Sequence, residues 1–161
     1  YMRSDVNSDL RRRLDYCFRE HPYPGVPQFE THVIDGRPFE INGVKIVPIE
    51  VFHGKLPIYG YRIGNFAYIT DASCIEPSER EKLYGVDTLI VNALRHRKHF
   101  AHFSIGQALD LIREIQPRQA YLTHLAHEAG KHKCLDTELP DNVHPAYDGL
   151  TIEICTHNYG D

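Results

Sequence analysis

Polar side chains that could bind a cation follow several apolar, strand-like segments of this 161-residue chain. His53 ends the segment KIVPIEVFH, Asp71 ends FAYITD and His124 ends QAYLTH. A further segment, VNALRHRKHFAHFS, continues into a basic stretch that contains Arg95, His96, His99 and His102. Ligands gather where loops leave a rigid sheet. Because imidazole and carboxylate groups together suit Zn, Mn or Fe ions, the pattern favours a metal site at these strand ends.

A structural interpretation stays open for each residue taken alone. A histidine at one strand end is usually a hydrogen-bonded structural residue. Asp71 in the turn-like DAS would in the same way serve as a cap for the following turn. Residue types and spacing therefore leave a metal site and a set of structural residues as alternatives.

Hydrophobic periodicity and turn residues predict the elements that carry these side chains. The predicted helices cover 4–18, 76–85 and 104–117. The predicted strands cover 29–34, 39–53, 56–63, 66–70, 86–94, 119–125 and 149–155, with tight turns at Asp35–Gly36, Asn42–Gly43, Gly64–Asn65 and Asp148–Gly149. The first half thus consists of antiparallel hairpins, and the second alternates strand, helix and strand. The predicted fold class is α/β (α+β layered), in one domain by length.

Composition excludes several classes of protein. Apolar residues make up 42% and charged residues 25% of the chain, which is typical of a globular domain. No apolar run reaches the roughly 20 residues that span a bilayer, so we expect no membrane contact. A net charge of -4 makes a nucleic-acid partner less favoured, although the stretch Arg11–Arg13 is basic. The four cysteines lie far apart without a CxxC pair, which favours free thiols in a reducing cytoplasm.

The motifs, in their order along the chain, resemble those of the metallo-β-lactamase-fold hydrolases. The segments are FHGKLPIYGYRIGNFAYITDAS, LIVNALRHRKHFAHFSIGQAL, AYLTHLAHEAG and AYDGLTIEI. The pattern is most similar to the branch that contains the phosphonate-pathway cyclic phosphodiesterase and the tRNA 3′-processing ribonuclease. This resemblance implies an αβ/βα sandwich with a dinuclear metal site that holds two divalent ions, Zn or Mn.

The resemblance also implies a role for individual residues. His53 matches a ligand of one metal ion, Asp71 the aspartate that bridges both ions, and His124 a ligand of the second. His102, in HFS, matches a catalytic histidine beside the scissile phosphate that protonates the leaving oxygen or stabilises its charge.

Three further residues have weaker assignments. His127 could hold a metal ligand or a carboxylate in place, and a surface histidine after a strand is the alternative. Arg95 and His99 could contact a substrate phosphate, and a solvated loop is the alternative.

One family motif does not occur in these 161 residues: two alternating histidines followed by an adjacent Asp-His pair. We therefore expect residues 1–161 to be the C-terminal portion of a single, longer hydrolase domain. His53, Asp71 and His124 alone would make a poor metal site. The chain by itself is expected to bind metal weakly or not at all and to be inactive.

For the intact protein, the sequence predicts a metal-dependent hydrolase of phosphoesters, with a small phosphodiester as the favoured substrate. The distance of 22 residues between His102 and His124 fits the phosphodiesterase branch. Two alternatives remain. One is a nuclease of the same fold. The other is a non-catalytic half-domain that binds a partner or forms a homodimer.

Overall fold

The computed structural model describes residues 1–154. The chain divides into two compact units, Tyr1–Arg37 and Pro38–Asp161. The predicted free thiol Cys155 lies outside the described residues, whereas Cys17, Cys74 and Cys134 are free thiols as predicted. Within the described part of the chain, no helix is both long and apolar enough to cross a membrane.

The first unit contains one α-helix and an extended return segment. Helix α1 (Ser4–Arg13) is followed by the short helix η1 (Asp15–Phe18), where the sequence predicted one continuous helix over 4–18. The strand predicted over 29–34 is wrong, since this segment forms only an isolated bridge between Val33 and Met2. Alternating hydrophobicity favours extended backbone, but a strand also needs a neighbouring strand for its hydrogen bonds.

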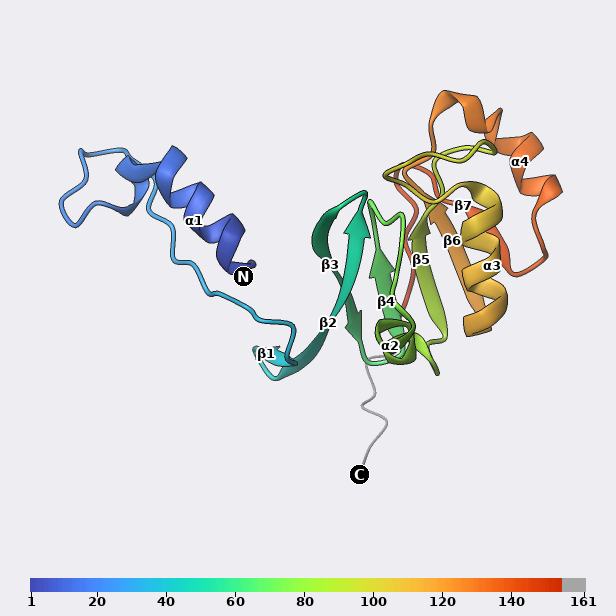
Figure 1. Cartoon of the computed structure of the whole chain (residues 1–161), viewed down its shortest axis with the longest axis horizontal. Helices are drawn as coiled ribbons and strands as arrows, with labels where there is room; N and C mark the ends of the chain where they lie inside the picture. The colour runs from blue at the N-terminus through green and yellow to red at the C-terminus, as the bar shows by residue number, and fades with distance from the viewer. Residues whose placement is uncertain (155–161) are drawn as a thin grey trace. The chain divides into compact units, whose positions relative to one another are not determined.

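The second unit contains one mixed sheet in which seven strands lie side by side in chain order (Figure 1). The strands are β1 (Phe39–Ile41), β2 (Val44–His53), β3 (Leu56–Ile63), β4 (Phe66–Ile69), β5 (Thr88–Asn92), β6 (Gln119–Thr123) and β7 (Val143–Pro145). Neighbours from β1 to β4 pair antiparallel, and those from β4 to β7 pair parallel. The predicted change from hairpins to strand–helix–strand units is therefore confirmed.

Tight turns set the register of the antiparallel half. Asn42 and Gly43 join β1 to β2, and both have positive φ, 50° and 79°. A two-residue Asn-Gly loop with this backbone has the twist that a hairpin needs. The long β2–β3 pairing then places His53 opposite Leu56, at the end of its strand.

The parallel half supplies most of the core, to which Ile49 and Val51 of β2 also belong. Ala67, Ile69, Leu89, Val91 and Leu122 are 0% exposed. Helix α3 (Ile105–Ile115) packs against β5 and β6 (Figure 1). The buried face of α3 consists of Ile105, Ala108, Leu111, Ile112 and Ile115.

The helix predicted over 104–117 is present as α3, which begins after a capping residue and ends before Pro117. Ser104 and Gln107 form a capping box at its start, which satisfies backbone N–H groups that the helix leaves free. At its end, Gln116 has a left-handed backbone, and Pro117 follows.

The shorter helices were predicted only in part. The predicted helix over 76–85 is present as α2 (Pro77–Arg80) and η2 (Glu81–Leu83). The sequence analysis missed η3 (His127–Ala129), α4 (His132–Glu138) and β7. These elements are short, so their periodicity gives little signal.

The strand predicted over 149–155 is wrong for residues 149–154, which form no strand. Its turn is present, with Gly149 at φ 87. In the described part of the chain no neighbouring strand pairs with this segment, so its alternating pattern does not produce a ladder.

Candidate metal centre

Asp71 lies just beyond the carboxyl end of β4 in a backbone conformation that few residues with a side chain adopt. β4 ends at Ile69, and Asp71 has φ 57. This left-handed region has a steric cost for any residue with a Cβ, although aspartate tolerates it better than most. The Thr70 hydroxyl donates a 3.0 Å hydrogen bond to Oδ2 of Asp71.

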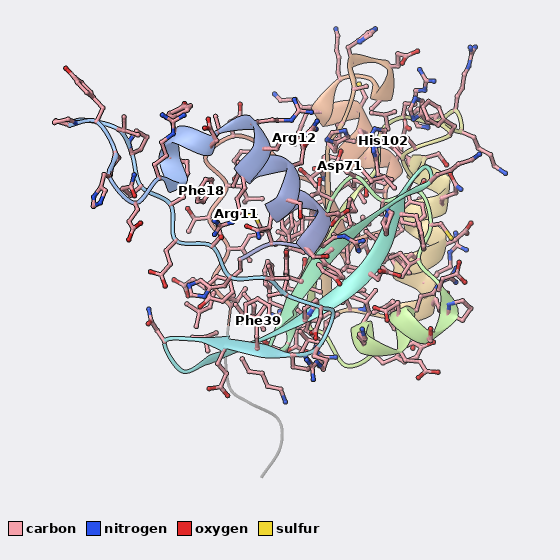
Figure 2. The ribbon with its side chains drawn as sticks, turned by 60° about the vertical axis from the view of Figure 1, so that its left-hand side comes forward. Arg11, Arg12, Phe18, Phe39, Asp71 and His102 are labelled. Atoms are coloured by element: carbon pink, nitrogen blue, oxygen red, sulfur yellow. The ribbon has the colours of Figure 1, made fainter. Side chains whose placement is uncertain are left out.

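Histidine rings gather around the other oxygen of this carboxylate. Oδ1 of Asp71 lies 3.4 Å from Nε2 of His124 and 3.7 Å from Nδ1 of His102. Nε2 of His53 is 3.4 Å from Nε2 of His102. One nitrogen or oxygen atom from each of His53, Asp71 and His102 lies within 4.8 Å of the others. Figure 2 labels Asp71 and His102 where they approach each other.

The fold accounts for this convergence. His53 is the last residue of β2, and His124 follows β6 with φ 57. His102 lies in the loop between β5 and α3, two residues before the capping residue Ser104. Because β4, β5 and β6 run parallel, their carboxyl ends meet at one edge of the sheet, where ligand sites of such sheets usually lie.

The surroundings of His102 favour the neutral form of its imidazole. Burial lowers the pKa of His102, and the neighbouring His124 and His53 lower it further, while the Asp71 carboxylate acts in the opposite direction. A neutral imidazole has one nitrogen with a free lone pair and one N–H donor. His102 can therefore ligate a cation or donate a hydrogen bond at neutral pH.

The residues fit a divalent cation. Nδ1 of His102 is buried and has no hydrogen-bond partner among residues 1–154, and the Asp71 carboxylate oxygen is 3.7 Å away. A buried polar atom without a partner is rare in proteins and requires an explanation. A cation between imidazole nitrogens and a carboxylate oxygen would satisfy these atoms, and this donor set suits Zn or Mn.

The three weaker candidates lie in different surroundings. The His99 ring stacks on that of His102, with centroids 5.1 Å apart. Arg95 forms an ion pair with Glu128, which lowers the pKa of that carboxyl group. His127 is exposed on η3, and within the described residues its ring makes no hydrogen bond or ring contact with the histidine cluster. The structure thus brings His99, but not His127, to the cluster.

The sequence did not reveal two features near the histidine cluster, a buried asparagine and an open cavity. Asn92 ends β5 and is 0% exposed. The sequence pattern that identified the other residues, a polar side chain at the end of an apolar strand, also applies to Asn92. An open cavity of about 330 Å³ borders His124. It is lined by Thr123, His124, Leu125, Ala146, Tyr147 and Asp148.

Comparison with known proteins gives one matching family and several similar structures. A model described as "Beta-lactamase superfamily domain" matches residues 1–125. The chain is similar to a diphosphatase of the PhnP family, with 31% identity, a TM-score of 0.86 and coverage of 96% of this chain and 57% of that one. It also resembles the short form of human tRNase Z, with 15% identity, a TM-score of 0.65 and coverage of 96% and 67%.

A curated relative is a longer protein. An octanoyltransferase from Porphyromonas gingivalis (strain ATCC BAA-308 / W83) is 40% identical over 152 residues, which are 93% of this chain and 31% of that protein. The chain therefore spans about a third of the length of this relative and just over half of the diphosphatase.

Proposed function

The chain belongs to the β-lactamase superfamily, and from that membership we propose that it takes part in metal-dependent hydrolysis of a phosphoester, with a phosphodiester as the favoured substrate. The observation that carries this proposal is the meeting of His53, Asp71, His102 and His124 at one edge of the sheet. These residues are 71 positions apart at most along the chain (124 − 53), so only the fold brings them together.

Each residue has a proposed task. His53 and His124 each offer an imidazole nitrogen and Asp71 offers its carboxylate, and these groups would hold the divalent cations. Two divalent ions, Zn or Mn, would supply Lewis acidity toward the phosphoryl oxygens and a water of lowered pKa. His102 donates a hydrogen bond to the leaving oxygen of the substrate and stabilises its developing charge, because its neutral ring retains one N–H.

Names of similar proteins support a reaction at phosphorus. The similar structures include a diphosphatase and a tRNase. The name octanoyltransferase belongs to a protein of which this chain matches only 31%. The cavity beside His124 offers room for a substrate group next to the reacting phosphate.

A nuclease is a second candidate, favoured by one surface feature. Arg97 and Lys98 are exposed in the loop that carries His102, and exposed cations beside a site attract a phosphate backbone. Phe100 in the same loop is 84% exposed, and such rings stack on unpaired bases. Hydrolysis of single-stranded RNA that falls steeply with salt, faster than that of a small diester, would favour this candidate.

A non-catalytic, partner-binding role is the third candidate. Val44, Leu56 and Tyr68, on strands β2 to β4, are each at least 40% exposed. A second copy of the chain would cover such apolar groups. Light scattering after size-exclusion chromatography separates an 18.6 kDa monomer from a homodimer.

The test of the main proposal uses matched substrates. Bis(p-nitrophenyl) phosphate, p-nitrophenyl phosphate, a nucleoside diphosphate, a β-lactam and a thioester are offered to a longer protein that contains this chain, with Zn or Mn present. We expect the diester to be hydrolysed best and Asp71→Ala to abolish the activity. Turnover of the β-lactam or thioester without turnover of any phosphoester contradicts the proposal.

A further inference from the structure

Asn92 has a fully buried amide group whose polar atoms both bind the backbone of one residue. Its Oδ1 accepts a 2.8 Å hydrogen bond from the Ala72 N–H. Its Nδ2 donates a 2.9 Å hydrogen bond to the Ala72 carbonyl oxygen. The side chain is 0% exposed, so water does not compete for these bonds. Asn92 therefore fixes the orientation of both peptide groups that flank Ala72.

Ala72 directly follows Asp71, whose backbone is in the left-handed region with φ 57. Such a conformation persists in a residue with a Cβ only where the surrounding structure holds it. The peptide that joins Asp71 to Ala72 carries the N–H that Asn92 accepts. Asn92 is therefore placed to hold the strained backbone that directs the Asp71 carboxylate.

The same segment connects to the loop of His102. The Ala72 carbonyl oxygen also accepts a 2.6 Å hydrogen bond from the N–H of Phe103. Phe103 follows His102 in the chain. One carbonyl group thus joins Asn92 to the residues next to Asp71 and His102.

Hydrogen bonds of Ser73 extend the connection to His53. Its N–H and its hydroxyl donate bonds of 2.7 and 2.8 Å to the Phe52 carbonyl oxygen. Its hydroxyl also accepts a 3.0 Å bond from the Gly54 N–H. Phe52 and Gly54 are the residues on either side of His53.

We propose that Asn92 is a positioning residue, whose buried amide holds residues 71–73 so that Asp71 and His53 can bind a divalent cation while the His102 ring stays beside them. This inference rests on the proposed function, because it assumes that these side chains bind a divalent cation. Asn92 itself does not touch the cation or the substrate in this scheme.

A purely structural role for Asn92 predicts a different pattern of effects. Any buried asparagine stabilises the fold when it is hydrogen-bonded. Asn65 gives a matched control, since it is 8% exposed and its amide donates a hydrogen bond to Asp87. It precedes β4, so it lies at the opposite end of that strand from Asp71. Replacing it removes a buried amide without touching residues 71–73.

The experiment compares Asn92→Ala with Asn65→Ala by NMR and thermal denaturation. Two readouts need no metal: hydrogen exchange of the Ala72 amide, and the strong NOE between Hα and the amide proton of Asp71 that a positive φ produces. The third readout is the Kd for Zn²⁺ alone, from chemical shifts of the histidine rings. If Asn92→Ala does not fold, Asn92→Thr replaces it, because a β-branched residue suits a strand and its hydroxyl is too short to bridge both groups of Ala72.

For Asn92→Ala we expect Ala72 exchange to be at least about tenfold faster, the Asp71 NOE to weaken and the Kd for Zn²⁺ to rise about tenfold. Asn65→Ala should lower the melting temperature and leave these three readouts unchanged. The proposal is overturned if both variants change the readouts alike, or if Asn92→Ala changes neither Ala72 exchange nor the Asp71 NOE. If the unmodified chain shows no Zn²⁺-dependent shifts, the cation site fails as a function of this chain. The exchange and NOE data still decide whether Asn92 positions Asp71.

Discussion

Asp71 and His124 adopt the same unusual backbone conformation at the ends of the two strands that flank β5, and their side chains meet. Each has φ 57, and Oδ1 of Asp71 lies 3.4 Å from Nε2 of His124. One residue follows β4 and the other follows β6, with β5 between them. Left-handed residues with a Cβ cluster at functional sites, where the structure tolerates their strain. Two residues with strained backbones and side chains that could bind a cation therefore lie at the same end of the sheet.

This strain gives a prediction for stability at His124. Glycine adopts a positive φ without steric cost, whereas alanine does not. His124→Gly should therefore be more stable than His124→Ala by about 1 kcal/mol, the reverse of the order in a helix. Urea denaturation followed by circular dichroism measures this difference. Equal stabilities would show that residue 124 leaves the left-handed region once the imidazole is gone.

Metal binding by these residues alone should be weak. His53, Asp71 and His124 offer three side chains for two cations, fewer than the four ligands that a tight zinc site requires for each ion. We expect calorimetric titration of residues 1–161 with Zn or Mn to give a Kd above the micromolar range. Submicromolar binding that Asp71→Ala abolishes would contradict this expectation.

The sequence predicted the fold well where elements are long and buried. The family resemblance and the α/β fold class are confirmed by the matching family model and the diphosphatase structure. β5 and α3 followed directly from an apolar run and from helical periodicity. The strand at 29–34 failed because a pattern of single residues contains no information about whether a partner strand lies alongside.

The residues of the candidate site could be predicted from the sequence, but the arrangement of their side chains could not. His53, Asp71, His102 and His124 were named from strand ends and motifs, and the structure places them together. Their individual roles stay predictions. Asn92 was missed because its importance comes from two hydrogen bonds to Ala72, 20 residues away in the chain. Pairings of this kind depend on the register of β4 and β5, which the sequence does not specify.

The start of α3 gives a prediction for the loop that carries His102. Ser104 is 4% exposed, and its hydroxyl accepts a 3.3 Å hydrogen bond from the Gln107 N–H. Ser104→Ala should lower the free energy of unfolding by about 1 kcal/mol. Ser78→Ala is the control, since Ser78 is exposed in α2, and should change this free energy by less than about 0.5 kcal/mol. Chemical denaturation of both variants tests the difference, which should vanish if the cap contributes nothing.

The role of His102 can be separated from that of a metal ligand. In a longer protein that contains this chain and hydrolyses a phosphodiester, His102→Ala should lower kcat about 10²-fold or more. The reason is that the leaving oxygen loses its N–H donor, while His53, Asp71 and His124 still hold the metal. Metal content, measured by atomic absorption, should therefore stay unchanged.

His99→Ala is the matched control, because His99 stacks on His102 without contacting Asp71 within the described residues, and it should lower kcat by less than about tenfold. A His102→Ala protein that has lost metal would instead identify His102 as a ligand, which its 3.7 Å distance from the Asp71 carboxylate also permits.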